Sequence, residues 1–275
     1  LTLTKSTVED AFRPLLKFVK DQTSGEDPSE IPIVLYATAG LRAIKDEKAK
    51  TAVMRAVREV LKQSEFEFRD DWARIIPGNE EGGLAWVAAN YLSGVLRKTD
   101  RESTKGVIEM GGGSTQVTFE VPQVQGLSSN ERYMFEDLKG RRYNIYAYSY
   151  LGFGQDYAQT EYYASLSPKE QSDPCCYPGR VCGNVNPLFG SGDFSACETH
   201  IRELVFGSSG SAHVPPTKSQ PKLHGAFYAT ENFFYVRDDA LPFTGLSEYV
   251  CSSSVVNTYR HCTIAYSFPH IDTTR

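Results

Sequence analysis

Three consecutive glycines, Gly111–Gly113, separate two stretches of strand-like sequence. The run Lys105–Met110 precedes them, and an alternating pattern from Ser114 to Val121 follows. In that pattern one face carries Thr115, Val117, Phe119 and Val121, and the other carries Gln116, Thr118 and Glu120. A period of two indicates a β-strand, and a short glycine run is typical of a turn. We therefore predict a strand–glycine turn–strand hairpin over Glu109–Glu120.

Upstream of this hairpin, short apolar runs alternate with longer helical patterns. Strands are predicted at 31–36 and 73–76, and a helix with one apolar face at 46–63. A further helix opens at Asn79–Gly82, with an expected apolar stripe of Leu84, Val87, Ala88, Tyr91, Leu92 and Val95. Trp86 falls opposite that stripe, where packing is a more common role than an interface. This alternation predicts the α/β class, and 275 residues suffice for one large domain or two small ones.

Charge and hydropathy argue against two broad classes of protein. The chain has 29 Lys and Arg against 34 Asp and Glu, a net charge of −5, whereas nucleic-acid-binding proteins usually carry a basic excess. We therefore expect no nucleic-acid partner. No uncharged apolar run approaches the roughly 18 residues of a membrane span, and no signal peptide is visible after Leu1. Membrane contact is expected only through segments absent from this chain.

All six cysteines lie in the second half of the chain: Cys175, Cys176, Cys182, Cys197, Cys251 and Cys262. An even number, with four in one stretch rich in glycine and proline, favours a disulfide-stabilised lobe. The alternative is six free thiols in a cytosolic protein. Zinc is the weakest interpretation, because neither the cysteines nor the five histidines show tetrahedral ligand spacing. Disulfides place the protein in the secretory pathway: the Golgi or ER lumen, the cell surface or the outside of the cell.

The glycine turn and its neighbours have the composition of a phosphate site. Glycine N–H groups can approach an anion closely. Ser114, Thr115 and Gln116 place two hydroxyls and an amide beside them, and Glu109 could hold a hydrated cation against phosphate oxygens. A flexible hairpin with an exposed glutamate explains this segment equally well when it is taken alone. No Walker-type sequence is present.

Two more polar residues lie where helices are predicted to begin. Thr38 lies in a strand-to-helix turn of small residues, which suits a phosphate contact. Such a turn also stabilises itself locally, and that alternative needs no ligand. Glu81 lies in the first turn of a predicted helix, where the helix dipole alone favours a carboxylate. Its functional interpretation is a general base that takes a proton from an attacking water.

Three strings of sequence carry a more specific signal. They are YATAGLR at 36–42, GNEEGGLAW at 78–86 with NYLSG at 90–94, and IEMGGGSTQV at 108–117. In order and spacing they resemble the second, third and fourth signature blocks of the apyrase family. This is the nucleoside triphosphate diphosphohydrolase (ecto-nucleotidase) family, which has a two-lobed actin/hexokinase-like (ribonuclease H-like) α/β fold. The resemblance continues through residues 148–154, 173–175, 190–194 and 226–228, and so spans most of the chain.

The resemblance implies that the full-length parent protein hydrolyses the terminal phosphates of nucleoside tri- and diphosphates by direct water attack, with Ca²⁺ or Mg²⁺, and it leaves open that this chain alone is inactive. It implies that Glu81 is the general base and that Ser114 and Gln116 position the water. The phosphate-binding residues it implies are Thr38, Ala39, Gly40, Gly111, Gly112, Gly113 and Ser114. Glu109 stands at the metal position, with contact expected through water. Tyr228 is a weak candidate for stacking on the nucleobase, and Cys251 with Cys262 resembles a family disulfide.

The resemblance also divides the chain and shows where it departs from the family. An incomplete, phosphate-binding first lobe is expected at 1–77 and a second lobe with a disulfide-rich, base-binding part at 78–275. The family's opening Asp-x-Gly-Ser-x-Gly hairpin and its closing signature are absent. Glu109 replaces an Asp, which moves the carboxylate by about 1.5 Å, and Gln155 replaces a basic residue. These departures keep open a non-catalytic nucleotide-binding or interaction protein, and the oligomeric state is not indicated.

Overall fold

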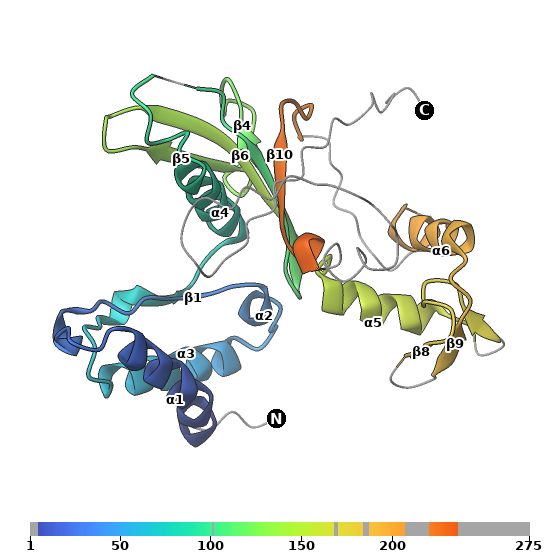
Figure 1. The fold of residues 1–275 in the computed structure, drawn as a ribbon, viewed down its shortest axis with the longest axis horizontal. Helices are drawn as coiled ribbons and strands as arrows, with labels where there is room; N and C mark the ends of the chain where they lie inside the picture. Colours follow the sequence, from blue (N-terminus) through green and yellow to red (C-terminus); the bar gives the residue numbers. More distant parts are fainter. Residues whose placement is uncertain (1–4, 101, 168–169, 184–186, 207–219, 236–275) are drawn as a thin grey trace. The chain divides into compact units, whose positions relative to one another are not determined.

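The computed structural model describes residues 5–100, 102–167, 170–183, 187–206 and 220–235. The chain divides into two compact units, Leu1–Pro77 and Gly78–Arg275, and each unit is described by itself (Figure 1). Within the described residues, every helix is too short or too polar to cross a lipid bilayer.

The first unit packs two long helices against a small parallel sheet. Its elements are α1 (Lys5–Gln22), η1 (Pro28–Glu30), β1 (Leu35–Ala37), α2 (Ala39–Arg42), α3 (Glu47–Lys62), η2 (Asp70–Trp72) and β2 (Ala73–Ile75). β1 and β2 are parallel. The carboxylate of Asp46 caps α3 by accepting hydrogen bonds from the N–H groups of Lys48 (2.9 Å) and Ala49 (3.2 Å). The core consists of Val8, Met54, Val57, Val60, Leu61 and Ala73.

The strand predicted at 31–36 is shorter and lies later in the chain. Only Leu35–Ala37 forms a ladder, and Pro32 makes a single isolated bridge to Glu67. Pro32 has no N–H to donate, which prevents a regular ladder at its position, and Val34 is half exposed. The helix predicted at 46–63 and the strand predicted at 73–76 are confirmed as α3 and β2.

The second unit contains a five-stranded sheet with α4 (Gly78–Leu92) across one face. The strands are β3 (Gly106–Met110), β4 (Ser114–Glu120), β5 (Arg132–Glu136), β6 (Arg142–Leu151) and β10 (Phe227–Glu231), in the order β10-β3-β4-β6-β5. Neighbouring strands are antiparallel except β10 and β3, which are parallel. β3 and β4 are the predicted hairpin, and the α/β class is confirmed.

Both faces of this sheet are covered. Under α4 lies a cluster of Trp86, Leu96, Val107, Tyr143, Ile145 and Ala147, and on the other face lies one of Phe119, Val121, Tyr146 and Phe227. The alternation along β4 correctly predicted which side chains share a face. Its polar face is nevertheless not a solvent face, because Gln116 is only 1% and Thr118 0% exposed. Buried polar groups of this kind need hydrogen-bond partners, and they mark this side of the sheet for closer attention.

α4 buries a different face from the one predicted. Tyr91 and Leu92, which belong to the expected stripe, are more than half exposed, whereas Trp86 is fully buried. The buried residues of the helix are Gly82, Gly83, Trp86 and Asn90. A Cβ atom on Gly82 would lie 2.5 Å from Oγ1 of Thr118, so the helix approaches the sheet through its glycines. The prediction of the apolar stripe was wrong because a search for periodic apolar side chains does not count glycine. The predicted packing role of Trp86 is confirmed.

The rest of the second unit is a small cysteine-rich part. It contains α5 (Gln155–Ser165), β7 (Ser172–Asp173), β8 (Val181–Cys182), β9 (Leu188–Gly190) and α6 (Phe194–Phe206), with the strands in the order β7-β9-β8. Disulfides join Cys175 to Cys197 and Cys176 to Cys182. The predicted disulfide-stabilised lobe is therefore confirmed for these four cysteines. The pair predicted between Cys251 and Cys262 lies outside the described residues.

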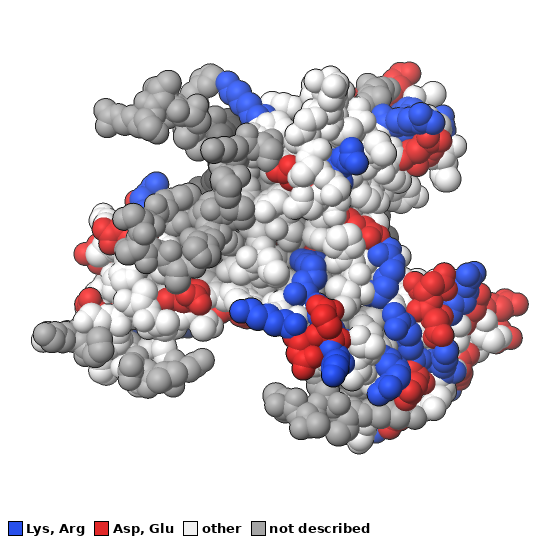
Figure 2. All heavy atoms as spheres, turned by 180° about the vertical axis from the view of Figure 1, so that it is seen from behind, with Lys and Arg blue, Asp and Glu red and all other residues white. Residues whose placement is uncertain are grey.

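Charges of both signs are interspersed on the face shown in Figure 2. In the first unit, for example, Lys62 pairs with Asp70 at 2.7 Å and Lys20 with Glu65 at 2.8 Å. All four side chains are about half exposed, and such pairs contribute little to stability. Within each of these pairs the two charges neutralise one another locally.

Candidate active site

The glycine turn between β3 and β4 is held by hydrogen bonds to its carbonyl groups. The N–H of Gly152 donates to the carbonyl of Gly113, that of Gln155 to Gly111, and that of Asp156 to Gly112, each at 2.9 Å. The connection from β6 to α5 therefore takes up all three carbonyls. Among the described residues, the N–H groups of Gly112 and Gly113 donate to no acceptor. Two N–H groups fixed in this way can bind an anion.

This turn requires glycine because the chain passes very close to it. A Cβ atom on Gly112 would lie 2.6 Å from Oδ2 of Asp156. A Cβ atom on Gly154 would lie 2.4 Å from the backbone of both Gly112 and Gly113. Gly154 is itself in an extended conformation, with φ −80°, so space and not backbone strain excludes a side chain there. The start of α5 and the glycine turn are therefore packed backbone to backbone.

Beside the turn, Gln116 is the centre of a buried hydrogen-bond group. Its amide Nε2 donates to Oγ of Ser114 at 2.8 Å and to Oγ of Ser149 at 3.2 Å. Ser114 is 2% exposed and Gln116 1%. Because the amide nitrogen makes both of these bonds, the carbonyl Oε1 remains to accept a hydrogen bond, such as one from water.

Glu81 lies in the first turn of α4. Gly78 and Gly82 flank it at the i−3 and i+1 positions. A Cβ atom on Gly78 would lie 2.2 Å from Cβ of Ser149, and one on Gly82 would lie 3.5 Å from Cβ of Gln116. Residues three and four apart share one face of a helix. The glycines therefore seat the first turn of α4 on Ser149 and Gln116, and Glu81 is half buried there, with Oε2 out of contact with solvent.

Glu109 is directly opposite Gln116 in the β3–β4 ladder. Directly paired residues of antiparallel strands point to the same face of the sheet, so the carboxylate belongs to the same polar group. Its Oε2 is buried. Carboxylate, amide and hydroxyl oxygens from Glu109, Gln116 and Ser114 are the kinds of ligand that Ca²⁺ and Mg²⁺ take, directly or through water. The donor set therefore fits a hard divalent cation.

The second predicted phosphate segment, Thr38–Gly40, belongs to the first unit and is described within it. The carbonyl of Thr38 accepts hydrogen bonds from the N–H groups of Leu41 (3.1 Å) and Arg42 (3.0 Å), which closes α2. Ala39 is buried and Gly40 is exposed. The local interpretation of this turn accounts for its geometry, and its phosphate role stays a prediction.

Tyr228, the predicted stacking residue, and Gln155, which replaces a basic residue of the family, have defined positions. Tyr228 is half buried on β10, one residue after Phe227, which is in the core. Gln155 opens α5 and uses its backbone N–H to hold the carbonyl of Gly111. The Gln155 side chain is exposed. Neither placement tests a contact with a nucleobase, and the stacking role of Tyr228 stays a prediction.

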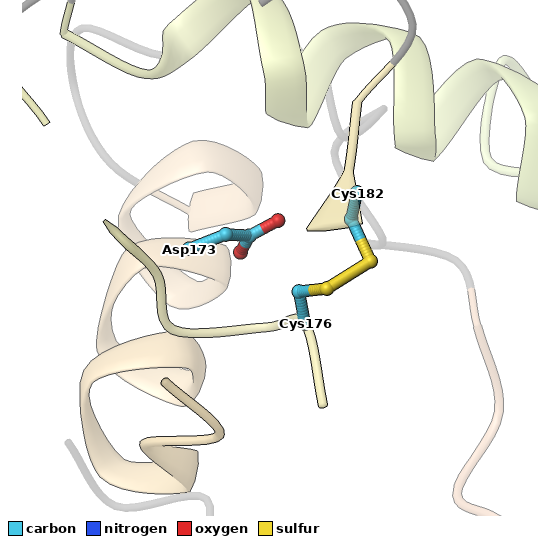
Figure 3. A group of neighbouring side chains, drawn as sticks. All are labelled: Asp173, Cys176 and Cys182. Atoms are coloured by element: carbon cyan, nitrogen blue, oxygen red, sulfur yellow. A yellow bond between two sulfur atoms is a disulfide. The ribbon is translucent and has the colours of Figure 1, made fainter. Parts of the chain in front are cut away.

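Figure 3 shows a separate group in the cysteine-rich part, in which Asp173, Cys176 and Cys182 have potential ligand atoms within 4.8 Å of one another. The two sulfur atoms are bonded to each other, so neither is the thiolate that a metal requires. Asp173 is fully buried and accepts hydrogen bonds from the hydroxyl of Tyr162 (2.6 Å) and the N–H of Cys175 (2.8 Å). Burial, together with the bond to Asp173, raises the pKa of Tyr162. The group therefore fastens α5 to β7, and in this disulfide form it gives the zinc interpretation no support.

Sequence reasoning missed two parts of the site. One is Ser149, which contacts both Gln116 and the start of α4. The other is the set of N–H groups from Gly152 to Asp156 that holds the glycine turn. Both lie in or just after the string YSYLGFG at 148–154. Its two glycines, close to a predicted phosphate turn, were the available signal, but the pairing of β4 with β6 cannot be derived from local sequence.

The described residues form an α/β fold with a buried polar group beside a glycine turn, and comparisons with known proteins show its family. The sequence model of the GDA1/CD39 (nucleoside phosphatase) family matches residues 4–259, and the chain belongs to that family. Probable apyrase 4 of Arabidopsis thaliana is 29% identical over 88% of this chain and 52% of its own length. Ectonucleoside triphosphate diphosphohydrolase 1 of Mus musculus is 32% identical over 76% of this chain and 48% of its own length.

The chain thus spans about half the length of these relatives. Among solved structures, one of nucleoside triphosphate hydrolases from Neospora caninum is similar, with a TM-score of 0.50 and 22% identity. The similarity covers 64% of this chain and 37% of that one. At this identity the likeness shows the fold alone, and it confirms the expected actin/hexokinase-like fold class.

Proposed function

We propose that this protein hydrolyses the terminal phosphate of nucleoside tri- and diphosphates by direct attack of water. The proposal is carried by three features of the second unit: a glycine turn whose N–H groups can bind an anion, a carboxylate in the first turn of the helix that packs on the sheet, and an amide on the strand beside that helix. These are the N–H groups of Gly112 and Gly113, Glu81 on α4, and Gln116 on β4. Membership of the GDA1/CD39 (nucleoside phosphatase) family supports the same chemistry.

In the proposed reaction a water molecule lies between Glu81 and Gln116. Glu81 takes a proton from it, and Oε1 of Gln116 and the hydroxyl of Ser114 orient it toward the terminal phosphorus. The new P–O bond forms as the bond to the bridging oxygen breaks, so that nucleotide and water give inorganic phosphate and a nucleotide shorter by one phosphate. Such a reaction depends on positioning and charge stabilisation more than on covalent catalysis.

The proposed phosphate-binding residues include members of each unit. In the second unit, the N–H groups of Gly112 and Gly113 and the hydroxyl of Ser114 are the donors, with Gly111 as the first residue of the turn. In the first unit, Thr38, Ala39 and Gly40 are the proposed counterpart. Backbone N–H groups are well suited to this task because they are already oriented and do not need to reorganise as charge develops.

A divalent cation completes the proposal. Glu109 would hold Ca²⁺ or Mg²⁺, through water in keeping with its extra methylene, and the oxygens of Gln116 and Ser114 lie on the same face of the hairpin. A cation bound there neutralises negative charge on the phosphate oxygens. Tyr228 is the proposed stacking partner for the nucleobase. The two disulfides support a place in the secretory pathway, and any membrane attachment is proposed only through segments outside this chain.

The test measures phosphate release from ATP, ADP and UDP with Ca²⁺ or Mg²⁺. It uses the chain itself and a form in which the family's Asp-x-Gly-Ser-x-Gly hairpin precedes Leu1. Glu81→Gln should lower kcat by about 10²- to 10⁴-fold, the usual range for a general base, with little change in nucleotide binding. Glu80→Gln, one residue away in the same helical turn, is the matched control and should stay within about twofold.

Two outcomes would count against the proposal in different ways. Near-normal turnover of Glu81→Gln would remove Glu81 from the mechanism. Intact nucleotide binding without hydrolysis in either form would favour a non-catalytic nucleotide-binding protein, and would point to Glu109 as the departure responsible.

A further inference from the structure

Ser149 lies between Gln116 on β4 and the start of α4, the helix that carries Glu81. It is directly opposite Gln116 in the β4–β6 ladder, and its Oγ accepts the hydrogen bond from Nε2 of Gln116 at 3.2 Å. On its other side it supports α4, because a Cβ atom on Gly78 would lie 2.2 Å from Cβ of Ser149. One side chain thus contacts both the water-orienting amide and the helix that carries Glu81.

We propose that Ser149 is a positioning residue that sets the orientation of the Gln116 amide relative to Glu81. The inference rests on the proposed function. Ser149 does not touch the substrate in this scheme; it acts through Gln116.

The physical argument starts from the symmetry of an amide. The Nε2 and Oε1 ends of a glutamine side chain have nearly the same shape, so only hydrogen bonds decide which end points where. Ser114 and Ser149 both lie within hydrogen-bond distance of Nε2, and the two contacts together hold this end of the side chain in place. Oε1 is then held on the opposite side, where it can accept a hydrogen bond from water. With only one of the two acceptors, the amide can rotate about χ3, and the water loses a fixed partner.

The contact with Gly78 makes the same residue a spacer. The first turn of α4 cannot move closer to β6, because Gly78 and Ser149 are already at the limit of approach. Hydroxyl and Cβ therefore have separable tasks: the hydroxyl orients Gln116, and the Cβ sets the height of Glu81 above the sheet. Ser149→Ala removes the first task and keeps the second, which makes it the informative substitution.

The first measurement is steady-state kinetics on the form of the protein that hydrolyses nucleotide. Ser149→Ala should lower kcat by about 10- to 100-fold with KM within about twofold, because misplacement of a reacting group acts on the transition state. In a Gln116→Met background, the same substitution should change kcat by less than about twofold, since its effect passes through the amide. Thr118→Val is the matched control: it removes a buried hydroxyl from the same face of β4, one with no hydrogen-bond partner among the described residues.

The second measurement does not need activity. In the chain selectively labelled with ¹⁵N-glutamine, the side-chain amide protons of Gln116 should exchange slowly with solvent. Exchange should be at least about tenfold faster in Ser149→Ala and unchanged in Thr118→Val, since one of two protecting hydrogen bonds is lost.

The results separate this inference from the proposed function. Equal losses of kcat for Ser149→Ala with and without Gln116 would overturn the positioning role, and so would unchanged amide exchange. If the unaltered protein hydrolyses no nucleotide, the proposed function fails. Faster exchange in Ser149→Ala would then still establish the contact that fixes the amide, and unchanged exchange would refute both.

Discussion

The turn Gly111–Gly113 is held by the chain around it, whereas the turn Thr38–Gly40 is held by its own backbone. In the first, three N–H groups from the β6–α5 connection bind the three glycine carbonyls. In the second, the carbonyl of Thr38 bonds to Leu41 and Arg42 within the same short helix. Gly154 leaves no room for a side chain against the backbone of Gly112 and Gly113, while a Cβ atom on Gly40 would meet nothing within 4 Å.

This difference bears on how ready each turn is to bind an anion. A turn held from outside is already in its binding conformation before the ligand arrives, so binding costs little ordering. A turn held only locally depends on its ligand for any further order. We infer that the second unit supplies the rigid part of the phosphate site, and three glycine substitutions test that comparison.

The largest effect is expected for Gly154→Ala. The backbone of Gly154 can accept alanine, but the new Cβ would lie 2.4 Å from the backbone of Gly112 and Gly113, which has no side-chain freedom with which to yield. We expect a loss of about 3 kcal/mol or more in the free energy of unfolding. Nucleotide hydrolysis should fall below detection. Urea unfolding and phosphate release measure the two effects, and unaltered values of both would contradict the close packing seen here.

Gly152→Ala should have an intermediate effect for a different reason. Gly152 has φ +90°, a conformation that alanine adopts only with strain, but a Cβ atom there would meet nothing within 4 Å. The expected cost is about 1–2 kcal/mol in the free energy of unfolding. We expect kcat to fall less than tenfold, because the new methyl group does not displace the turn Gly111–Gly113. If Gly152→Ala and Gly154→Ala lower kcat equally, then the effect on kcat comes from the backbone conformation of residues 152–154 and not from their contact with the turn Gly111–Gly113.

Local sequence determined much of this site, and long-range pairing determined the rest. The hairpin around Gly111–Gly113 was predictable because alternation and a glycine run are local signals. The buried face of α4 was not predictable from local sequence. It is formed largely by glycines, which have no apolar side chain to detect but allow the helix to lie close to the sheet. Ser149 was missed for the same reason: its importance comes from β6 pairing with β4, a contact between residues 33 apart. The roles of Glu81, Ser114 and Gln116 came from family resemblance, which no periodicity argument could have replaced.

The smallest structural effect is expected for Gly40→Ala, and this makes it the sharpest test of the first unit. Gly40 is exposed, has no positive φ and has open space at its Cβ position, so the fold does not require glycine there. Alanine should stabilise the protein by about 0.4–1 kcal/mol, since it restricts the unfolded chain. If phosphate approaches this turn, the added methyl group will instead raise KM for ATP several-fold, with kcat nearly unchanged. A KM equal to that of the unaltered protein would remove Gly40 from the proposed phosphate site, with the turn at Gly111–Gly113 as the remaining candidate.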